Sequence, residues 1–323
     1  MGKRMEKQKS YSVADFARRQ ALIIVLIGIV VVFSFLSKQF LTTNNIVNIF
    51  RQISTIAVMG AGMTFCIVGG NFDLSVGALL SLCGCMFISM YDKFGTIPAL
   101  LITLGVGCVS GVVCGFLCGY LRLNSMIVTL GMQQVLQALT LMFTGGQYVQ
   151  LKDINAPITV IGKGNLGIIP ISVIIMAVFC ILYAMVLSKT VFGHHVKAVG
   201  SNSETSRYSG INDKKVVLLT FVLSGVSAAI GGIILSTRGG GGQSTMGMGY
   251  EFDVITAVIL GGASLAGGSG SIFRTFIGAL IIGILKTGFV LLGLSSYTQY
   301  VAECIIILFA VYLDISAGKR KVR

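Results

Sequence analysis

Long apolar runs alternate with short polar segments along most of this chain. A membrane-spanning helix needs about 20 predominantly apolar residues, and most of the runs approach that length. The alternation therefore predicts an all-α integral membrane protein with about ten transmembrane helices. The runs are Ala21–Leu36, Ile53–Gly69, Leu74–Tyr91, Ile97–Leu121, Met126–Thr144, Gly167–Leu187, Val216–Ser236, Val254–Gly267, Ile272–Leu292 and Thr298–Asp314.

Two of these runs, Leu74–Tyr91 and Val254–Gly267, are short or interrupted by glycine. Non-helical backbone at membrane depth is tolerated where protein covers it or where it lines a cavity. We therefore expect a broken or re-entrant element at each place.

The composition supports a membrane protein. Hydrophobic residues make up 54% of the 323 residues and charged residues 11%, whereas a soluble domain has about 25% charged residues. The net charge of +13 does not indicate nucleic-acid binding, since the cations lie in the tails and loops with few aromatic residues among them.

Positive charge is distributed unequally between alternate loops. If the N-terminus is cytoplasmic, the cytoplasmic segments carry 17 Lys and Arg residues and the outer loops carry 6, with Lys286 inside a span. Cytoplasmic loops are enriched in Lys and Arg, so this count predicts that both termini are cytoplasmic. The chain then consists of a basic tail over residues 1–20, one transmembrane domain over residues 21–314 and a second basic tail over residues 315–323. No small-residue cleavage site follows the first run, so we expect a retained helix rather than a signal peptide.

Ser188–Lys215 is a long polar segment between two apolar runs, and the charge count places it in the cytoplasm. It holds 5 of the 24 Lys and Arg residues and both histidines. The segment is either a solvated loop or a surface that another protein contacts. We favour the second interpretation.

A short helix is predicted inside this polar segment. Asn202 or Ser203 can cap a helix over Glu204–Tyr208, and Gly210 can end it. Such a helix, held between two transmembrane helices, conveys motion only if both of its ends are rigidly joined to them. The flanking residues 188–201 and 211–215 are expected to be connecting arms.

Two acids stand at the entry of the short apolar runs. Asp73 can accept hydrogen bonds from backbone N–H groups at a helix start, or it can be a polar contact on a substrate path. Phe252-Asp253 repeats Phe72-Asp73 in a helix of opposite direction. The repetition fits an inverted five-plus-five repeat, although chance explains two matching residues equally well.

Lys286 and Glu303 are the charges deepest in apolar runs. A lone charge there is costly, so the two are expected to form an intramembrane ion pair. The alternative is a proton relay, which would favour a secondary transporter.

Glycines 107, 111, 115 and 119 recur at a spacing of four residues in the fourth run. This pattern gives one helix face that lets another backbone approach closely. We expect it to pack within the chain, with a homodimer seam as the alternative.

The motifs of enzymes and metal sites are missing from the sequence. The eight cysteines all lie in apolar runs without a CxxC pair, which indicates small buried hydrophobes. There is no GxxxxGK[ST] for ATP, no HExxH, and no credible Ser-His-Asp set because both histidines are adjacent. GGGG at 239–242 and GGASLAGGSG at 261–270 are interpreted as an outer loop and a tight helix break. We therefore expect no catalytic residue, cofactor or metal.

Four segments, taken in chain order, resemble the ribose-type permeases of ATP-binding-cassette (ABC) sugar importers. The likeness extends over most of the chain, from about residue 43 to residue 314. The segments are GGNFDLSVG, VFGHHVKAVGSNSETSRYSGI, GYEFDVITAVILGGASLAGGSGS and GLSSYTQY with the following IIILFAVYLD.

The resemblance implies a permease of the bacterial cytoplasmic membrane that pairs with a second copy and docks on a cytoplasmic ABC ATPase. An extracytoplasmic binding protein would deliver a monosaccharide, such as ribose. The family's coupling segment falls on Gly193–Ile211, which implies ATPase-coupling roles for Asn202, Ser203, Glu204, Ser206, Arg207 and Gly210. Candidates for the substrate path are Asn71, Asp73, Gln133, Gln134, Glu251 and Asp253.

The chain departs from the family pattern at three places. It has Asn124-Ser125-Met126 where a proline commonly precedes the fifth helix, Glu303 where a basic residue is usual, and Lys286 where the residue is often neutral. Two other classes stay open: an ion-coupled secondary transporter that uses Lys286–Glu303 or Asp73, and a structural membrane scaffold.

Overall fold

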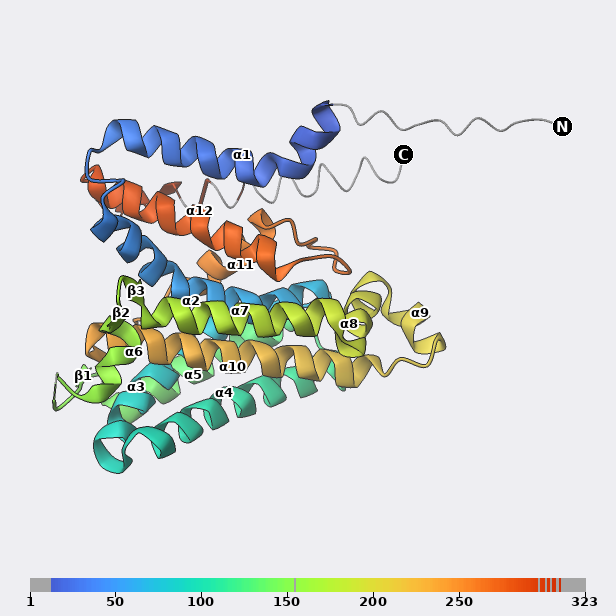
Figure 1. Cartoon of the computed structure of the whole chain (residues 1–323). Coiled ribbons are helices and arrows are strands. Elements are labelled where there is room, and N and C mark those ends of the chain that lie inside the picture. Colours follow the sequence, from blue (N-terminus) through green and yellow to red (C-terminus); the bar gives the residue numbers. More distant parts are fainter. Residues whose placement is uncertain are drawn as a thin grey trace.

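The computed structural model describes residues 13–295 apart from 154, and beyond them residues 297–299, 301, 302, 304, 305 and 308. Its long helices lie side by side in one bundle (Figure 1). They are α1 (Val13–Leu36), α2 (Thr43–Val68), α3 (Val76–Phe94), α4 (Thr96–Gly119), α5 (Ser125–Thr144), α7 (Ile171–Lys189), α10 (Asp213–Gly239) and α12 (Ile272–Leu291).

Short elements join the long helices at the two ends of the bundle. At one end lie α8 (Val191–Ser201) and α9 (Ser203–Tyr208), and we call this the α9 end (Figure 1). The opposite end, the β1 end, has two small antiparallel pairs: β1 with β4, and β2 with β3. Its elements are β1 (Val149–Gln150), a 3-10 helix (Pro157–Thr159), α6 (Val160–Lys163), β2 (Asn165–Leu166), β3 (Ile169–Pro170) and β4 (Gly241–Gly242).

Among the described residues, seven helices are long and apolar enough to cross a membrane: α2, α3, α4, α5, α7, α10 and α12. The first helix, α1, begins at Val13, earlier than the predicted Ala21, and its apolar part is Leu22–Leu36. Most of the predicted tenth run lies outside the described residues. An all-α membrane protein is thus confirmed, and the number of ten spans stays a prediction.

The eighth predicted run is a short helix, α11 (Tyr250–Leu260), of 11 residues. At 1.5 Å per residue it is about 16 Å long, roughly half of the ~30 Å hydrocarbon core. The segment before it enters the bundle beside α3, because the Gly247 N–H donates to the Ser81 hydroxyl at 2.9 Å. The expected broken element is present here.

The third predicted run differs from the expectation. Its helix, α3, is continuous over 19 residues. The irregular backbone lies before it, over residues 69–75, where Gly70 has φ +79°. The break therefore separates α2 from α3 and does not interrupt the helix itself.

The four-residue glycine stripe of α4 packs against α10. A Cβ at Gly107 would lie 2.6 Å from the Gly225 carbonyl oxygen, and one at Gly111 would lie 2.5 Å from the Phe221 carbonyl oxygen. Real Cβ atoms do not come so close to backbone. The stripe is therefore used within the chain, as the sequence predicted, and α10 leaves no room for a second copy along it.

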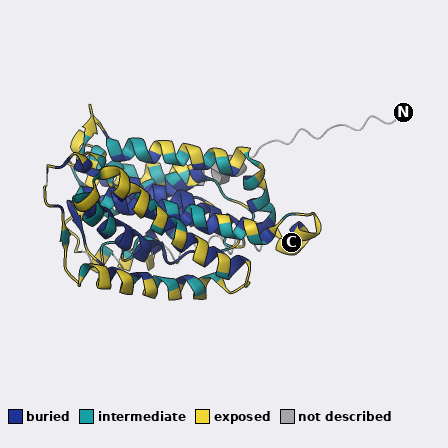
Figure 2. Cartoon of the chain, turned by 90° about the horizontal axis from the view of Figure 1, so that it is seen from below, coloured by how far each residue is buried: buried dark blue, intermediate teal, exposed yellow. Residues whose placement is uncertain are grey.

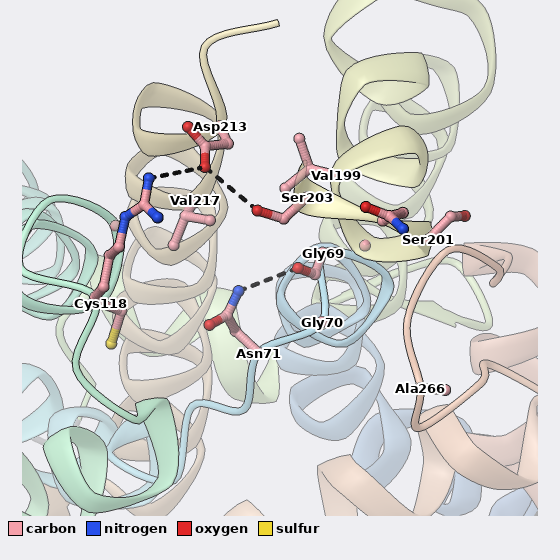
Figure 3. A pocket seen from close by; sticks show the side chains of 14 residues that line it. Gly69, Gly70, Asn71, Cys118, Val199, Ser201, Ser203, Asp213, Val217 and Ala266 are labelled. Atoms are coloured by element: carbon pink, nitrogen blue, oxygen red, sulfur yellow. Dashed lines mark hydrogen bonds and ion pairs between the residues drawn. The ribbon is translucent and has the colours of Figure 1, made fainter. Parts of the chain in front are cut away.

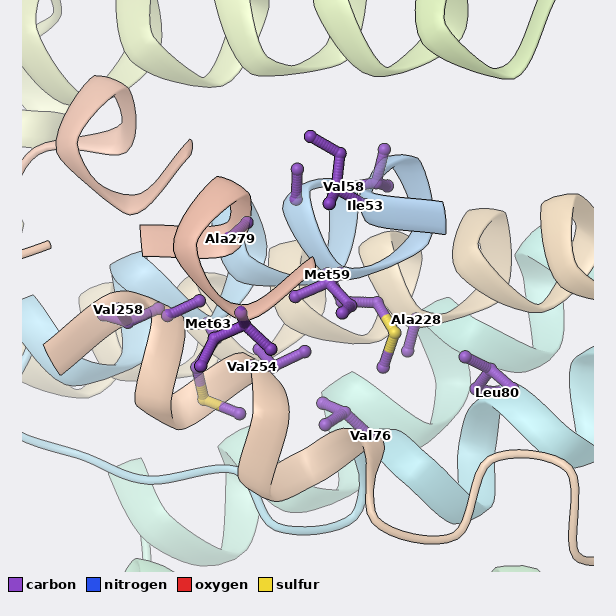
Figure 4. Close-up of a cluster of buried hydrophobic side chains, with 14 of the residues drawn as sticks. Ile53, Val58, Met59, Met63, Val76, Leu80, Ala228, Val254, Val258 and Ala279 are labelled. Atoms are coloured by element: carbon purple, nitrogen blue, oxygen red, sulfur yellow. The ribbon is translucent and has the colours of Figure 1, made fainter. Parts of the chain in front are cut away.

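Buried side chains from the long helices and from α11 fill the centre of the bundle. Figure 4 shows this cluster, in which Met59 and Met63 of α2 lie against Val254 and Val258 of α11. α2 is buried throughout from Ile53 to Val68, whereas α4, α5 and α7 expose many apolar residues. Figure 2 shows that exposed residues lie along the outer helices of the bundle. Such exposed apolar faces suit contact with lipid.

We expect Gly111→Leu to prevent close packing of α4 on α10. Overpacking costs about 1–3 kcal/mol or more, and here the obstacle is backbone, which cannot rotate away. The free energy of unfolding in detergent, measured from the thermal transition, should fall accordingly.

Gly105→Leu is the matched control, because Gly105 lies on the same helix with open space around its Cα. It should leave the transition nearly unchanged. Equal effects of the two substitutions would contradict the proposed packing.

Candidate functional site

Local sequence signals build α8 and α9. The Thr190 hydroxyl accepts from the Gly193 N–H at 3.2 Å and caps α8. Asn202 lies between the two helices, and its side chain accepts from the Thr205 N–H at 2.8 Å. Gly210 has φ +84° and follows the end of α9. The predicted cap, short helix and terminating glycine are confirmed.

The helix α8 is packed firmly on the bundle, which the sequence did not predict. Its Val196 and Val199 are buried in a cluster with Phe65 and Leu187. Near its end, a Cβ on Gly200 would collide with the Val68 carbonyl oxygen. The segment that leads to α9 is therefore a helix packed against the bundle.

In contrast, α9 extends from the bundle with most of its side chains in solvent (Figure 1). Tyr208 is 86% exposed, and Glu204 and Arg207 are also exposed. Ser206 is buried, and its hydroxyl donates to the Asn202 carbonyl at 2.8 Å. An exposed helix joined to α8, which packs against the bundle, is a geometry suited to contact with another protein.

Asp213, the first residue of α10, joins α9 to the bundle, and sequence reasoning missed it. One of its oxygens, Oδ2, accepts from the Ser203 hydroxyl at 3.3 Å and lies 3.4 Å from Arg207 Nε. The same oxygen lies 3.6 Å from Nη2 of Arg122, in the loop between α4 and α5. The available sequence signal was an acid at a helix start within a basic segment.

A polar cavity of about 560 Å³ opens beneath these residues at the α9 end. Figure 3 shows Ser203 and Asp213 on one side of it and Asn71 on another, with the Asn71 amide donating to the Gly69 carbonyl at 3.1 Å. The cavity thus connects the break before α3 with the base of α9.

Asp73 lies deeper and is buried. Its Oδ1 accepts from the Ser75 N–H at 3.1 Å and from the Ser75 hydroxyl at 2.6 Å. Its Oδ2 accepts from the Ser224 hydroxyl of α10 at 2.8 Å. The backbone bond at the entry of α3 agrees with the capping interpretation, and the Ser224 bond additionally fixes the start of α3 to α10.

Two further candidates meet across α5 and α11. Gln133 Nε2 donates to Glu251 Oε1 at 3.3 Å, and Glu251 is buried beside α3, where a Cβ on Gly77 would collide with its carboxylate. Gln134, the next residue of α5, is exposed. The structure therefore brings Gln133 and Glu251 together and separates Gln134 from them.

Lys286 of α12 donates to Asp253 of α11, with Nζ 2.6 Å from Oδ2. The lysine thus has an acidic partner on a neighbouring helix, in addition to the one that the sequence suggested. Glu303 lies outside the described residues, so the Lys286–Glu303 pair stays a prediction.

Neither metal ligands nor disulfides occur among the described residues. No group of three or more His, Cys, Asp or Glu side chains could hold a metal ion there. The eight cysteines are free thiols, and most are buried in helices. The polar groups described above can contact or orient other molecules.

Comparisons with known proteins agree with this architecture. The family model described as "Branched-chain amino acid transport system / permease component" matches residues 45–311. The chain is 36% identical over 310 residues to the ribose import permease protein RbsC of Escherichia coli strain K12, with 95% of this chain and 96% of that protein covered. Identity to RbsC of Bacillus subtilis strain 168 is 39% over 288 residues, covering 88% and 89%. Identity to the xylose transport system permease protein XylH of Haemophilus influenzae is 33% over 365 aligned positions, covering 92% and 96%.

No solved structure matches the chain. The family match nevertheless spans most of its length, and the relatives align with it nearly from end to end. The chain therefore belongs to this permease family, among the ribose-type ABC sugar permeases, which are transport subunits and not enzymes.

Proposed function

We propose that this chain is the membrane-spanning subunit of an ATP-driven importer that carries a monosaccharide, ribose or a related small sugar, into a bacterial cell. The observation that supports the proposal is that α9 is exposed and joined to the packed helix α8, in a chain similar to ribose and xylose permeases. The chain has no P-loop, so the energy must come from a separate ATPase.

We place the α9 end in the cytoplasm. Arg122 and the polar segment with five Lys and Arg residues belong to this end, whereas Arg51, Lys93 and Arg238 belong to the β1 end. This distribution supports cytoplasmic termini and the bacterial inner membrane as the location. The sugar-binding protein then approaches the β1 end.

We further propose that two copies of the chain form the membrane part. α5 is the helix that the bundle covers least among the seven. Its free surface includes the polar Gln134 as well as apolar side chains. A polar side chain that faces lipid is costly, so contact of this face with a second copy, or with the path between copies, explains its sequence.

We assign Asn71, Asp73, Gln133, Gln134, Glu251 and Asp253 to the sugar path or to its gates. The support is that two breaks, before α3 and before α11, bring Asn71, Asp73, Glu251 and Asp253 to elements that enter the bundle from opposite ends. Gln133 and Gln134 lie on α5, where Gln133 contacts Glu251. Half-helices and irregular backbone at such positions line the binding sites of many transporters. The same arrangement supports the inverted five-plus-five repeat.

Uptake by reconstituted protein tests the main proposal. We expect radiolabelled ribose to enter liposomes that contain this chain, its ABC ATPase and its binding protein only when ATP is supplied on the ATPase side. The comparison is with liposomes that contain the chain alone under a proton or sodium gradient. Gradient-driven uptake without the ATPase would show that the chain is a secondary transporter, with Lys286 and Asp253 as the first candidates for coupling.

Charge reversal on α9 tests the docking surface. We expect Glu204→Lys to weaken co-purification of the ATPase by about tenfold, since a reversed charge meets a surface selected to complement the acid. Asp153→Lys, an exposed position at the β1 end, is the matched control and should leave ATPase binding intact. If both variants bind the ATPase like the wild type, α9 is not the docking helix.

Truncation of the buried acid in α11 tests the path. We expect Glu251→Ala to lower ATP-driven uptake by about tenfold. The substitution removes the hydrogen bond that closes the proposed gate and leaves the Gln133 amide without its partner. Glu251→Gln keeps the size of the side chain and a hydrogen bond, so uptake should fall less than in Glu251→Ala. Uptake rates are compared at equal amounts of assembled complex, and wild-type rates for both variants would remove Glu251 from the path.

A further inference from the structure

The environment of Asp213 differs from that of an ordinary helix-capping acid. Three donors from two separate segments converge on Oδ2: Ser203 and Arg207 from α9, and Arg122 from the α4–α5 loop. Its other oxygen, Oδ1, accepts from the backbone N–H of Lys214 at 3.0 Å. Asp213 is thus the common acceptor of α9 and of the loop that joins two membrane helices.

The distances show that this oxygen is shared. Charge-assisted hydrogen bonds are about 2.7–2.9 Å long when they are fully formed. Here the three donors lie at 3.3, 3.4 and 3.6 Å, so none of them is at its best distance. A displacement of α9 would change the Ser203 and Arg207 contacts directly, whereas the Arg122 contact does not involve α9.

Burial differs strongly between acceptor and donors. The Asp213 side chain is 12% exposed, whereas the side chains of Arg207 and Arg122 are 45% and 50% exposed. The carboxylate is held at the start of α10, and both guanidinium groups can exchange it for water at little cost. Contacts of this kind are suited to being remade during a transport cycle.

The backbone of the α4–α5 loop directs Arg122 toward this contact. Arg122 has φ +56°, and it is the one non-glycine residue with positive φ in the part of the chain that the structure describes. A long side chain in this conformation is uncommon, and the surrounding structure must hold it there. The ion pair with Asp213 is one such restraint.

We propose that Asp213 is a positioning residue that couples α9 to the transmembrane helices. Its Oδ2 exchanges one ion-pair partner, Arg207, for another, Arg122, as the ATPase moves α9. When α9 is drawn away, Arg207 and Ser203 leave Oδ2 and Arg122 takes the full ion pair. The α4–α5 loop then follows α10. The inference rests on the proposed function, and it adds a residue that neither the sequence motifs nor the docking surface identifies.

The test is the number of sugar molecules imported per ATP hydrolysed by the complete complex in liposomes. We expect Asp213→Asn to lower this ratio about threefold, the effect of removing a half-exposed ion pair. Arg122→Gly keeps the positive φ and removes only the side chain, and it should lower the ratio similarly. Because both changes break the same contact, the double variant should show no further loss.

Asp92→Asn is the matched control, since Asp92 accepts a backbone hydrogen bond from Lys152 at the opposite end of the bundle. It should keep the wild-type ratio, and Asp213→Glu, which keeps the charge, should recover most of it. A wild-type ratio for Asp213→Asn, or losses that multiply in the double variant, would overturn the proposal.

Failure of the complex to assemble and failure of uptake can both be distinguished from failure of the proposal. If Asp213→Asn does not assemble with the ATPase, the ratio is measured for Arg122→Gly and Ser203→Ala. Wild-type ratios for both variants would overturn the proposal. If the wild-type complex shows no ATP-driven uptake, the proposed function itself has failed, since the ratio is defined only for a working importer.

Discussion

The close approach of α10 to three neighbouring helices is the constraint on which the rest of the structure depends. Small residues make it possible on each side: Gly225 faces Gly107 of α4, Ser227 faces Gly62 of α2, and Gly232 faces the Leu80 carbonyl of α3. Lipid is as apolar as a helix surface, so association in a membrane relies on such packing and on hydrogen bonds. Larger side chains at these positions would separate α10 from the helices that it holds together.

Because α10 packs closely on its neighbours, its polar groups have defined positions relative to them. Ser224 donates to Asp73 and so determines where α3 can begin, while Asp213 stands at the α9 end. A buried carboxylate without partners is costly at membrane depth. The irregular backbone over residues 69–75 brings the Ser75 N–H and hydroxyl to Oδ1 of Asp73, so both oxygens of the acid are hydrogen-bonded. The break before α3 and the packing of α10 therefore depend on each other.

The sequence predicted those features whose signals are local. The four-residue glycine period in α4, the Asn202 cap and Gly210 each act within one or two turns, and all appear as expected. The helix α8 was missed because its buried valines match apolar side chains of α2 and α7, which are distant in the chain. The ion pairs of Asp213 and Asp253 were missed for the same reason, since their partners Arg122 and Lys286 are brought close only by the fold.

The two kinds of contact around α10 indicate where motion can occur. Along α4, backbone meets backbone, and densely packed surfaces of this kind do not deform continuously. α10 and α4 must therefore move as one body, by rotation or by sliding against less tightly joined helices. α5 and α11 are better placed to slide, because α5 is mostly exposed and α11 is a short helix with irregular backbone on both sides. The Gln133–Glu251 contact joins these two helices, so a displacement of α5 relative to α11 would open or close that contact.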